Sequence, residues 1–274
     1  MRDLNAELVF ARAIARHAGR LILDVYETDF AVVEKDAGAG PVTEADRRAN
    51  EYIVTELHRA FPNDGIIAEE SKDNSDSRKF DRCWFVDPLD GTKEFVARNG
   101  EFAVHIGLAI DGQAALGVVY KPVDRKLYAG TPEGSTLELD GEIRELHVSE
   151  RSDPSTLRLL VSRSHRSKRT EEIRAFLGIG EVIECGSVGV KCGLIAEGAA
   201  DLYIHPSPSS SRWDSCAPEA ILRGAGGRFT DLSGLPYRYD GLEVLNTRGL
   251  LGCNSAAFDA VLPIVAKVMV RPPT

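Results

Sequence analysis

Residues 84–95 read WFVDPLDGTKEF, in which an apolar run ends at two aspartates, a glycine and a threonine. The apolar run predicts a buried strand, and Pro88 should end its pairing because proline lacks a backbone N–H. A carboxylate at the end of a buried strand must face water, cap a backbone group or hold a cation, because burying it unpaired is costly. Asp87 and Asp90 can converge on one point, where they repel unless a proton or cation lies between them. Such oxygen ligands suit a hard cation such as Mg²⁺.

The two residues that follow this acidic pair add a second element of the site. Gly91 lets the backbone come close to an anion, and Thr92 brings a hydroxyl next to the cation. Backbone N–H groups at a turn that opens into a helix are suited to hold phosphate. The stretch therefore predicts a metal and phosphate site. An aspartyl-phosphate mechanism of the D-x-D-G-T kind is excluded, because Pro88 occupies the position of its nucleophile.

Three other places carry carboxylates that could join this site. Asp46 lies in PVTEAD, Glu69 and Glu70 lie in IIAEES, and Asp214 lies in RWDSCAPE. Each also has a purely structural interpretation. Asp46 fits a T-x-x-D helix-capping pattern, and Asp214 could be the N-cap of a helix that contains residues 217–222. The glutamates could be a solvated loop pair, as most charge pairs are.

The elements that must position these side chains follow from the spacing of apolar residues. Helical periodicity predicts helices over residues 4–25 and 44–60. Strands predominate in the rest of the first half, with Asp-Gly hairpin turns at residues 111–112 and 140–141. The expected strands cover residues 83–86, 102–110, 114–120, 135–139 and 143–148. This half should form an antiparallel sheet covered by helices.

The rhythm changes after the polar stretch at residues 149–156, where strands and helices begin to alternate. Alternation of this kind favours a layered α/β lobe with a mixed sheet. The expected strands cover residues 157–161, 181–185, 200–205 and 250–254, and the expected helices cover residues 168–178, 188–198, 217–227 and 256–269. We therefore predict two lobes, residues 1–150 with most of the metal ligands and residues 151–274 with the substrate-binding residues and Asp214.

Composition narrows the range of partners and locations. The chain has 274 residues and a formal net charge of -9, which argues against a nucleic-acid polymer or an anionic membrane, since both require a basic face. Its five cysteines show no zinc-ligand CxxC spacing and are expected to be reduced thiols. Charges interrupt the N-terminal apolar residues, and no segment approaches the length of a membrane span. We expect a cytoplasmic monomer or homodimer that acts on a small-molecule phosphate ester.

The motifs PVTEAD, AEES, DPLDGTKEF and WDSCAPEAILRGAGG occur in an order that resembles the lithium-sensitive, Mg²⁺-dependent superfamily of inositol monophosphatase. Residues 93–95, 162–165, 186–187 and Lys191 are most similar to the 3'(2'),5'-bisphosphate nucleotidases of the CysQ type. The resemblance runs from the first helix to the last. It implies an α/β fold, with an α+β N-terminal lobe and an α/β C-terminal lobe, layered as the αβαβα sandwich of inositol monophosphatase and fructose-1,6-bisphosphatase. It also implies hydrolysis of the 3'-phosphate of adenosine 3',5'-bisphosphate and of its sulfated form.

The resemblance further implies which residues hold metal. Glu69, Asp87 and the Leu89 carbonyl would hold one Mg²⁺. Asp87, Asp90 and Asp214 would hold a second. Two ions on opposite oxygens of an in-line displacement stabilise both the entering and the leaving group.

Water activation and substrate binding are implied in the same way. Thr92 and Asp46 would orient and deprotonate the attacking water, with Glu70 and a third Mg²⁺ as a further contribution. Substrate-binding residues would be Gly91, Thr92, Ser164, His165, Ser187, Lys191, Arg212 and Asp214. Lysine and arginine suit this role because they pair well with phosphate. His165 and Lys93 could equally be ordinary loop residues.

Two alternatives to the nucleotidase remain open at this stage. The first is another phosphomonoesterase of the superfamily, acting on inositol monophosphate or a sugar bisphosphate with the same metal chemistry. The second is a non-catalytic nucleotide or metal sensor on this fold, since a fold does not guarantee activity. Only residues of the substrate pocket distinguish the first alternative, whereas the second predicts loss of a metal ligand or of the water-activating pair.

Overall fold

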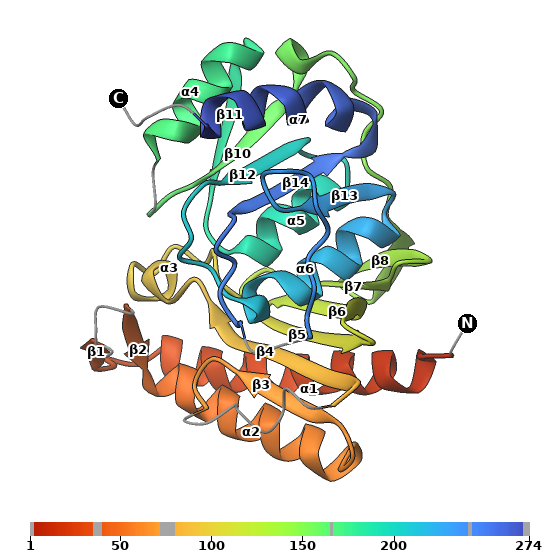
Figure 1. The fold of residues 1–274 in the computed structure, drawn as a ribbon. Helices are drawn as coiled ribbons and strands as arrows, with labels where there is room; N and C mark the ends of the chain where they lie inside the picture. The colour runs from red at the N-terminus through yellow and green to blue at the C-terminus, as the bar shows by residue number, and fades with distance from the viewer. Residues whose placement is uncertain (1–2, 35–39, 72–79, 165–166, 241–242, 271–274) are drawn as a thin grey trace.

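Helices and strands are stacked in five layers in the computed structural model, which describes residues 3–34, 40–71, 80–164, 167–240 and 243–270. In Figure 1 the layers follow one another from the helix pair at the bottom to the helix pair at the top. The helical layers are α1 (Asn5–Tyr26) with α2 (Glu44–Ala60), α5 (Val188–Ala196) with α6 (Arg212–Gly224), and α4 (Lys168–Leu177) with α7 (Ser255–Met269). One sheet lies between each two successive helical layers. The predicted αβαβα sandwich is confirmed.

The first sheet contains seven strands, which are antiparallel except for the parallel pair β3 and β4. Its strands in order are β3 (Gly65–Ala68), β4 (Arg82–Asp90), β5 (Ala103–Ile110), β6 (Gln113–Lys121), β7 (Lys126–Thr131), β8 (Gly134–Leu139) and β9 (Glu142–Glu145). Both hairpin turns predicted at the Asp-Gly pairs are present. Strands β3 and β7 were not predicted, and neither was the small hairpin of β1 (Val32–Glu34) and β2 (Pro41–Thr43). Strands β1, β2 and β3 have only three or four residues, too few for a recognisable alternation, and β7 is buried along four consecutive residues and does not alternate.

The second sheet has five strands and is mixed, as predicted. Its strands in order are β11 (Glu181–Cys185), β10 (Arg158–Ser162), β12 (Leu202–His205), β14 (Leu250–Asn254) and β13 (Gly227–Thr230). The prediction of a helix over residues 217–227 was wrong at both ends. Helix α6 begins at Arg212 and ends at Gly224, and the residues from Gly227 onward pair with β14 as an edge strand.

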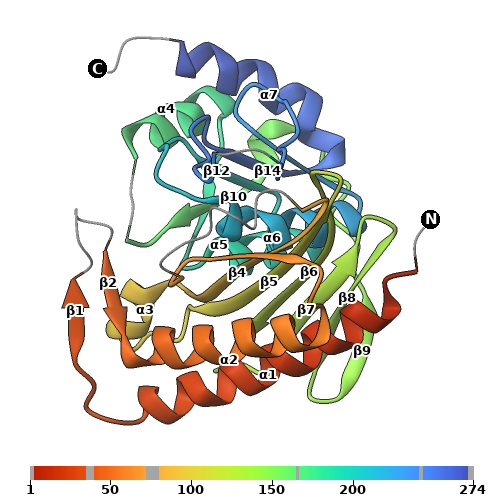
Figure 2. The same ribbon diagram turned by 60° about the horizontal axis from the view of Figure 1, so that its bottom comes forward.

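The middle helical layer packs against both sheets. Along β5, Val104, Ile106 and Leu108 belong to the core beneath α1 and α2, whose helices lie side by side across the sheet in Figure 2. The alternate residues of β5 face α5 and α6 instead. Helix α6 comes especially close to β6, because a Cβ at Gly117 would lie 2.2 Å from the carbonyl oxygen of Ala217. The first residues of α6 are thereby held near the end of β4. The lobe boundary at residue 150 stays a prediction, since α5 and α6 pack with both sheets.

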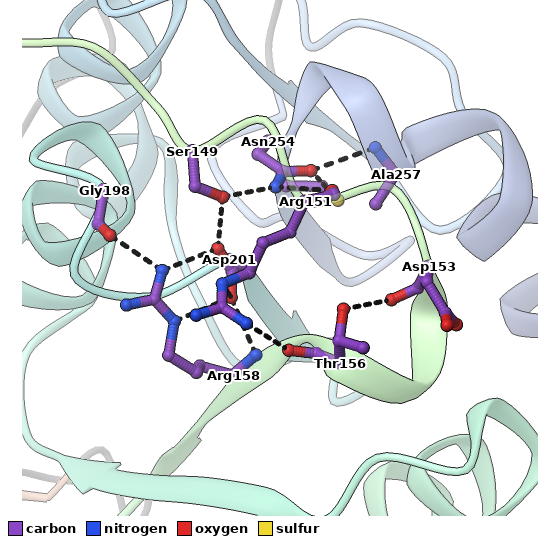
Figure 3. A network of polar contacts seen from close by, with 10 residues as sticks. Ser149, Arg151, Asp153, Thr156, Arg158, Gly198, Asp201, Asn254 and Ala257 are labelled. Atoms are coloured by element: carbon purple, nitrogen blue, oxygen red, sulfur yellow. Dashed lines mark hydrogen bonds and ion pairs between the residues drawn. The ribbon is translucent and has the colours of Figure 1, made fainter.

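The segment between β9 and β10, residues 146–157, is the connector between the two sheets. A buried ion pair fixes it (Figure 3). Asp201 has no exposed surface, and its two oxygens each accept a hydrogen bond of 2.9 Å from the guanidinium of Arg158. The Ser149 hydroxyl also donates to Asp201, and the Asn254 side chain donates to Ser149 at 2.8 Å. This complete pairing offsets the cost of burying the carboxylate. The network joins the connector to β10 and to the start of α7.

Candidate metal centre and active-site cavity

Strand β4 carries the acidic pair at its carboxyl end. It pairs with β5 as far as Asp87, opposite His105, and the pairing resumes at Asp90, opposite Ala103. The prediction that Pro88 ends the pairing was therefore wrong. The register shifts between Asp87 and Asp90, and this irregularity accommodates the proline, as bulges commonly do.

Helix α6 supplies a third carboxylate to this pair. Ligand atoms of Asp87, Asp90 and Asp214 all lie within 4.8 Å of one another. Asp214 is the third residue of α6, and its Oδ2 accepts the backbone N–H of the N-cap residue Ser211 at 2.7 Å. The prediction that Asp214 is itself the N-cap was wrong. Although the helix begins earlier than predicted, at Arg212, the Asp214 carboxylate lies next to the acids at the end of β4.

The electrostatics of this cluster favour a bound proton or cation. Burial raises the pKa of Asp87 well above its usual range, and the charges of Glu69, Asp90 and Asp214 raise it further. Burial likewise raises the pKa of Asp214, with Asp90 and Glu69 adding to the effect. Glu69 lies in the turn after β3, where its backbone N–H donates to the Val86 carbonyl at 3.1 Å. Crowded carboxylate oxygens are the donor set that Mg²⁺ prefers, so these residues fit a divalent cation.

Each acid of the cluster is fixed through one of its oxygens. Oδ1 of Asp87 accepts the Leu89 N–H at 2.9 Å, and Oδ2 of Asp90 accepts the Val188 N–H at 2.5 Å. Burial alone would raise the pKa of Asp90, yet His105 and other nearby donors hold it below its usual value. Asp90 is therefore the member of the cluster that stays ionised. Such outer contacts orient a ligand before a metal arrives.

Asp46 and Thr92 form a second polar group near the end of β4. Oδ2 of Asp46 accepts the backbone N–H of Thr43 at 2.8 Å and its hydroxyl at 2.7 Å, so the predicted capping box is confirmed. The Thr92 hydroxyl lies 3.2 Å from Oδ1 of Asp46 and 3.2 Å from the Leu89 carbonyl oxygen. Asp46 is fully buried, and Gly91 precedes Thr92 as the N-cap of α3 (Thr92–Val96). Asp46 therefore takes part in the cap of α2 and also contacts the Thr92 hydroxyl.

A cavity of about 350 Å³ opens beside these residues. Sequence-predicted residues that line it are Asp90, Gly91, Thr92, Lys93, Ser164, Ser187, Lys191 and Asp214. Lys191 is only 2% exposed, with its Nζ 3.2 Å from the Cys185 carbonyl oxygen and 5.0 Å from the centre of the Tyr203 ring. The lining also includes Tyr203 and His205, which the sequence did not single out.

Arg212 and Glu70 do not line this cavity, and neither do Asp46, Glu69, Asp87 and Leu89. Arg212 donates to Oδ1 of Asn246 at 2.5 Å, and its guanidinium lies 4.7 Å from the centre of the Tyr237 ring. Glu70 is half-buried in the turn that follows β3. His165 lies outside the described residues.

Two further residues were missed at the sequence level. Glu94 is 4% exposed, lines the cavity, and accepts a hydrogen bond of 2.8 Å from Ser164. His105 is fully buried, with Nε2 3.1 Å from Oδ2 of Asp90. A signal for His105 was present, since it is the only charged or strongly polar residue in the run FAVHIGLAI. No short-range pattern could reveal that it faces Asp90.

The fold and the site define a layered α/β protein with a cluster of acidic residues that could hold a metal ion. The chain belongs to the inositol monophosphatase family, whose profile matches residues 3–269. It is 36% identical over 228 residues to 3'(2'),5'-bisphosphate nucleotidase CysQ of Escherichia coli (strain K12), which covers 82% of this chain and 91% of that protein.

Solved structures show the same relationship. The crystal structure of CysQ from Bacteroides thetaiotaomicron has a TM-score of 0.78 and 33% identity, covering 92% of this chain and 99% of that one. An inositol monophosphatase from Anabaena (Nostoc) sp. PCC 7120 has a TM-score of 0.80 and 26% identity, covering 99% and 98%. Among the described residues, no helix is both long enough and apolar enough to span a membrane.

Proposed function

We infer that this protein is a Mg²⁺-dependent phosphomonoesterase that hydrolyses the 3'-phosphate of adenosine 3',5'-bisphosphate. The observation that carries this proposal is the convergence of Asp87, Asp90 and Asp214 within 4.8 Å beside a cavity that a buried lysine also lines. The cavity volume of about 350 Å³ falls within the range of small-molecule sites. The choice of a nucleotide is supported by sequence identity, which is 36% and 33% to the two CysQ relatives and 26% to the inositol monophosphatase from Anabaena.

The acidic residues divide into metal ligands and water-activating groups in this proposal. Asp87, Asp90 and Asp214 would hold Mg²⁺, together with Glu69 and the Leu89 carbonyl. When bound, the metal supplies Lewis-acid polarisation of the phosphate and of water. We propose that two or three Mg²⁺ ions bind at this site.

The protein's own groups move the proton. The Thr92 hydroxyl, which lies 3.2 Å from Oδ1 of Asp46, can donate to that oxygen and accept a hydrogen bond from a water molecule. As the water oxygen attacks phosphorus, its proton passes through the hydroxyl to Asp46. The ester P–O bond breaks, the leaving oxygen takes a proton from solvent, and Asp46 returns its proton to solvent, so that one phosphate ester and one water give an alcohol and inorganic phosphate. Asp46 is suited to this role because Thr43 holds its other oxygen in place.

The second phosphate of the nucleotide would be recognised by Lys191. Its ammonium group is buried at the cavity lining, where it donates to the Cys185 carbonyl and lies over the Tyr203 ring, and its charge also acts on Asp90. A phosphate dianion would be a stronger partner than the carbonyl or the ring. Ser164 and Ser187 also line the cavity and supply hydroxyls. Arg212 remains a prediction that the cavity lining does not support, and His165, which lies outside the described residues, remains an untested prediction.

A substrate panel tests the activity and its specificity together. We expect phosphate release from adenosine 3',5'-bisphosphate in the presence of Mg²⁺ and much slower release from inositol 1-phosphate. Asp87→Asn should abolish turnover on both compounds while the protein stays folded. Activity on inositol 1-phosphate without activity on the nucleotide would refute the nucleotidase assignment, and wild-type turnover by Asp87→Asn would refute the metal site.

A second comparison isolates the role of Lys191. The variant Lys191→Met should lower kcat/KM for adenosine 3',5'-bisphosphate by at least about tenfold, the loss of roughly one charge-assisted hydrogen bond. Adenosine 3'-phosphate lacks the second phosphate, so its hydrolysis should change much less. Lys126→Met is the matched control, because Lys126 pairs with Glu197 away from the cavity lining. Equal losses on both nucleotides would remove Lys191 from the proposed binding site.

A further inference from the structure

One oxygen of Asp90 is surrounded by donors from the start of α5. Its Oδ2 accepts the Ser187 hydroxyl at 2.5 Å, the Val188 N–H at 2.5 Å and the Gly189 N–H at 3.3 Å. These groups are the N-cap and first residues of α5, nearly 100 residues away along the chain. The carboxylate of β4 therefore serves as the anion at the start of this helix. Its Oδ1 is then the oxygen that can be offered to a metal.

His105 is the fourth group on the same oxygen. It lies on β5 directly opposite Asp87, and its Nε2 is 3.1 Å from Oδ2 of Asp90 and 3.4 Å from the Ser187 hydroxyl. Its other ring nitrogen, Nδ1, is buried and has no hydrogen-bond partner among the described residues. The ring proton that faces Asp90 is therefore assigned to Nε2.

The backbone around this contact is adapted to it. A Cβ at Gly189 would lie 2.2 Å from Nε2 of His105, so only glycine lets α5 approach the ring this closely. Ser187 has φ 52° and ψ 131°, a conformation that is costly for a residue with a side chain. Strain of this kind persists only where surrounding contacts hold it, and the hydroxyl of Ser187 makes those contacts with Asp90 and the Val190 N–H.

We propose that His105 and Ser187 are positioning residues that clamp Oδ2 of Asp90, so that Asp90 binds Mg²⁺ through Oδ1 alone. The same clamp fixes the start of α5 against the metal centre. Since Lys191 lies one turn further along α5, the clamp also sets the place of the lysine relative to the metal. This inference rests on the proposed metal-dependent function; it adds His105, which no sequence motif indicated, and gives Ser187 a role other than the substrate binding expected from the sequence.

Calorimetric titration of the metal-free protein with MgCl₂ alone tests the clamp. His105→Leu removes the donor at similar volume, whereas His105→Gln keeps an amide nitrogen near the position of Nε2. We expect the Kd for Mg²⁺ to rise about 10- to 100-fold in His105→Leu and to rise also in Ser187→Ala, since outer-shell partners typically contribute this much. His105→Gln should recover most of the affinity. The Mg²⁺ concentration for half-maximal phosphate release should move by the same factor.

Ser135→Ala is the matched control, because Ser135 is equally buried and donates to the Ile221 carbonyl at 2.8 Å, away from the acids. Its Mg²⁺ affinity should equal that of the wild type. Folded His105→Leu and Ser187→Ala proteins with wild-type affinity would overturn the proposal, and so would His105→Gln binding as weakly as His105→Leu. If His105→Leu does not fold, Ser187→Ala and His105→Gln decide by the same criterion. A wild-type protein that binds no Mg²⁺ would overturn the proposed function itself, and this inference with it.

Discussion

Replacing Asp214 by asparagine should stabilise the metal-free protein while it weakens metal binding. Ligand atoms of Asp87, Asp90 and Asp214 lie within 4.8 Å, so one ionised pair repels by about 3.5 kcal/mol or more at an effective dielectric constant of about 20. Asparagine keeps an oxygen that can accept the Ser211 N–H, and it carries no charge. In the wild type a bound proton already relieves part of this repulsion, so the stabilisation by Asp214→Asn is smaller than the full repulsion energy. We expect the free energy of unfolding to increase by about 2–3 kcal/mol near pH 8.

The pH dependence of this gain has a definite sign. The folded-state pKa of Asp214 is raised, so the wild type is most stable below the usual aspartate pKa and loses stability as pH rises toward the folded-state value. Asparagine does not titrate, so Asp214→Asn does not lose stability in this way as pH rises. The difference between the two proteins should therefore be near zero at about pH 4 and grow as pH rises above the usual aspartate pKa.

Thermal and urea unfolding with chelator, and again with saturating MgCl₂, measure both effects. We expect Asp214→Asn to unfold about 5–10 °C above the wild type without metal near pH 8. Mg²⁺ should stabilise the wild type by about 2.7 kcal/mol at 100 times its Kd and stabilise the variant far less. Asp259→Asn, an exposed aspartate on α7, is the control and should change neither measurement. A variant that is less stable than the wild type without metal, or equally stabilised by Mg²⁺, would refute the reasoning.

Three other substitutions test separate parts of the structure. Asp201→Asn should cost about 2–3 kcal/mol in urea unfolding, because it removes the buried charge that pairs with the part-buried Arg158 guanidinium; a loss below about 1 kcal/mol would contradict the network in Figure 3. Gly189→Ala should weaken Mg²⁺ binding in calorimetry as His105→Leu does, because its Cβ displaces the ring; unchanged affinity would argue against the close approach. Burial raises the pKa of Glu219 to about 7, so the wild type should lose about 3 kcal/mol of stability between about pH 4.5 and 7, and Glu219→Gln should abolish this loss. A parallel pH profile in Glu219→Gln would exclude Glu219 as its source.

Much of the fold could be predicted because it depends on neighbours in the sequence. The long helices α1 and α2 have apolar faces at helical spacing, and the capping box at Thr43 lies within four residues. The Asp-Gly hairpins follow from turn chemistry in the same way. Short strands such as β3 and β13 gave no comparable signal, since they are four residues each and acquire their strand character from pairing with neighbours.

The candidate site was likewise predictable only in part. The residue types and the strand end at Asp87 were enough to indicate oxygen ligands for a hard cation. The N-cap of α6 was placed three residues too late, at Asp214 instead of Ser211, because both residue types are equally plausible N-caps. Arg212 was selected for its charge, whereas its direction is set by its contacts with Asn246 and Tyr237.

By itself, the sequence determined where along the chain the chemistry resides and which helices and strands carry it, because caps, turns and periodicity act over a few residues. Only the tertiary structure decided which acids meet and which of their oxygens are already bonded. The contact between Asp90 and Val188 joins positions 98 residues apart, and His105 reaches Asp90 only because two strands and a glycine-containing helix pack together. Such contacts depend on the relative placement of whole layers, and no local pattern encodes that placement.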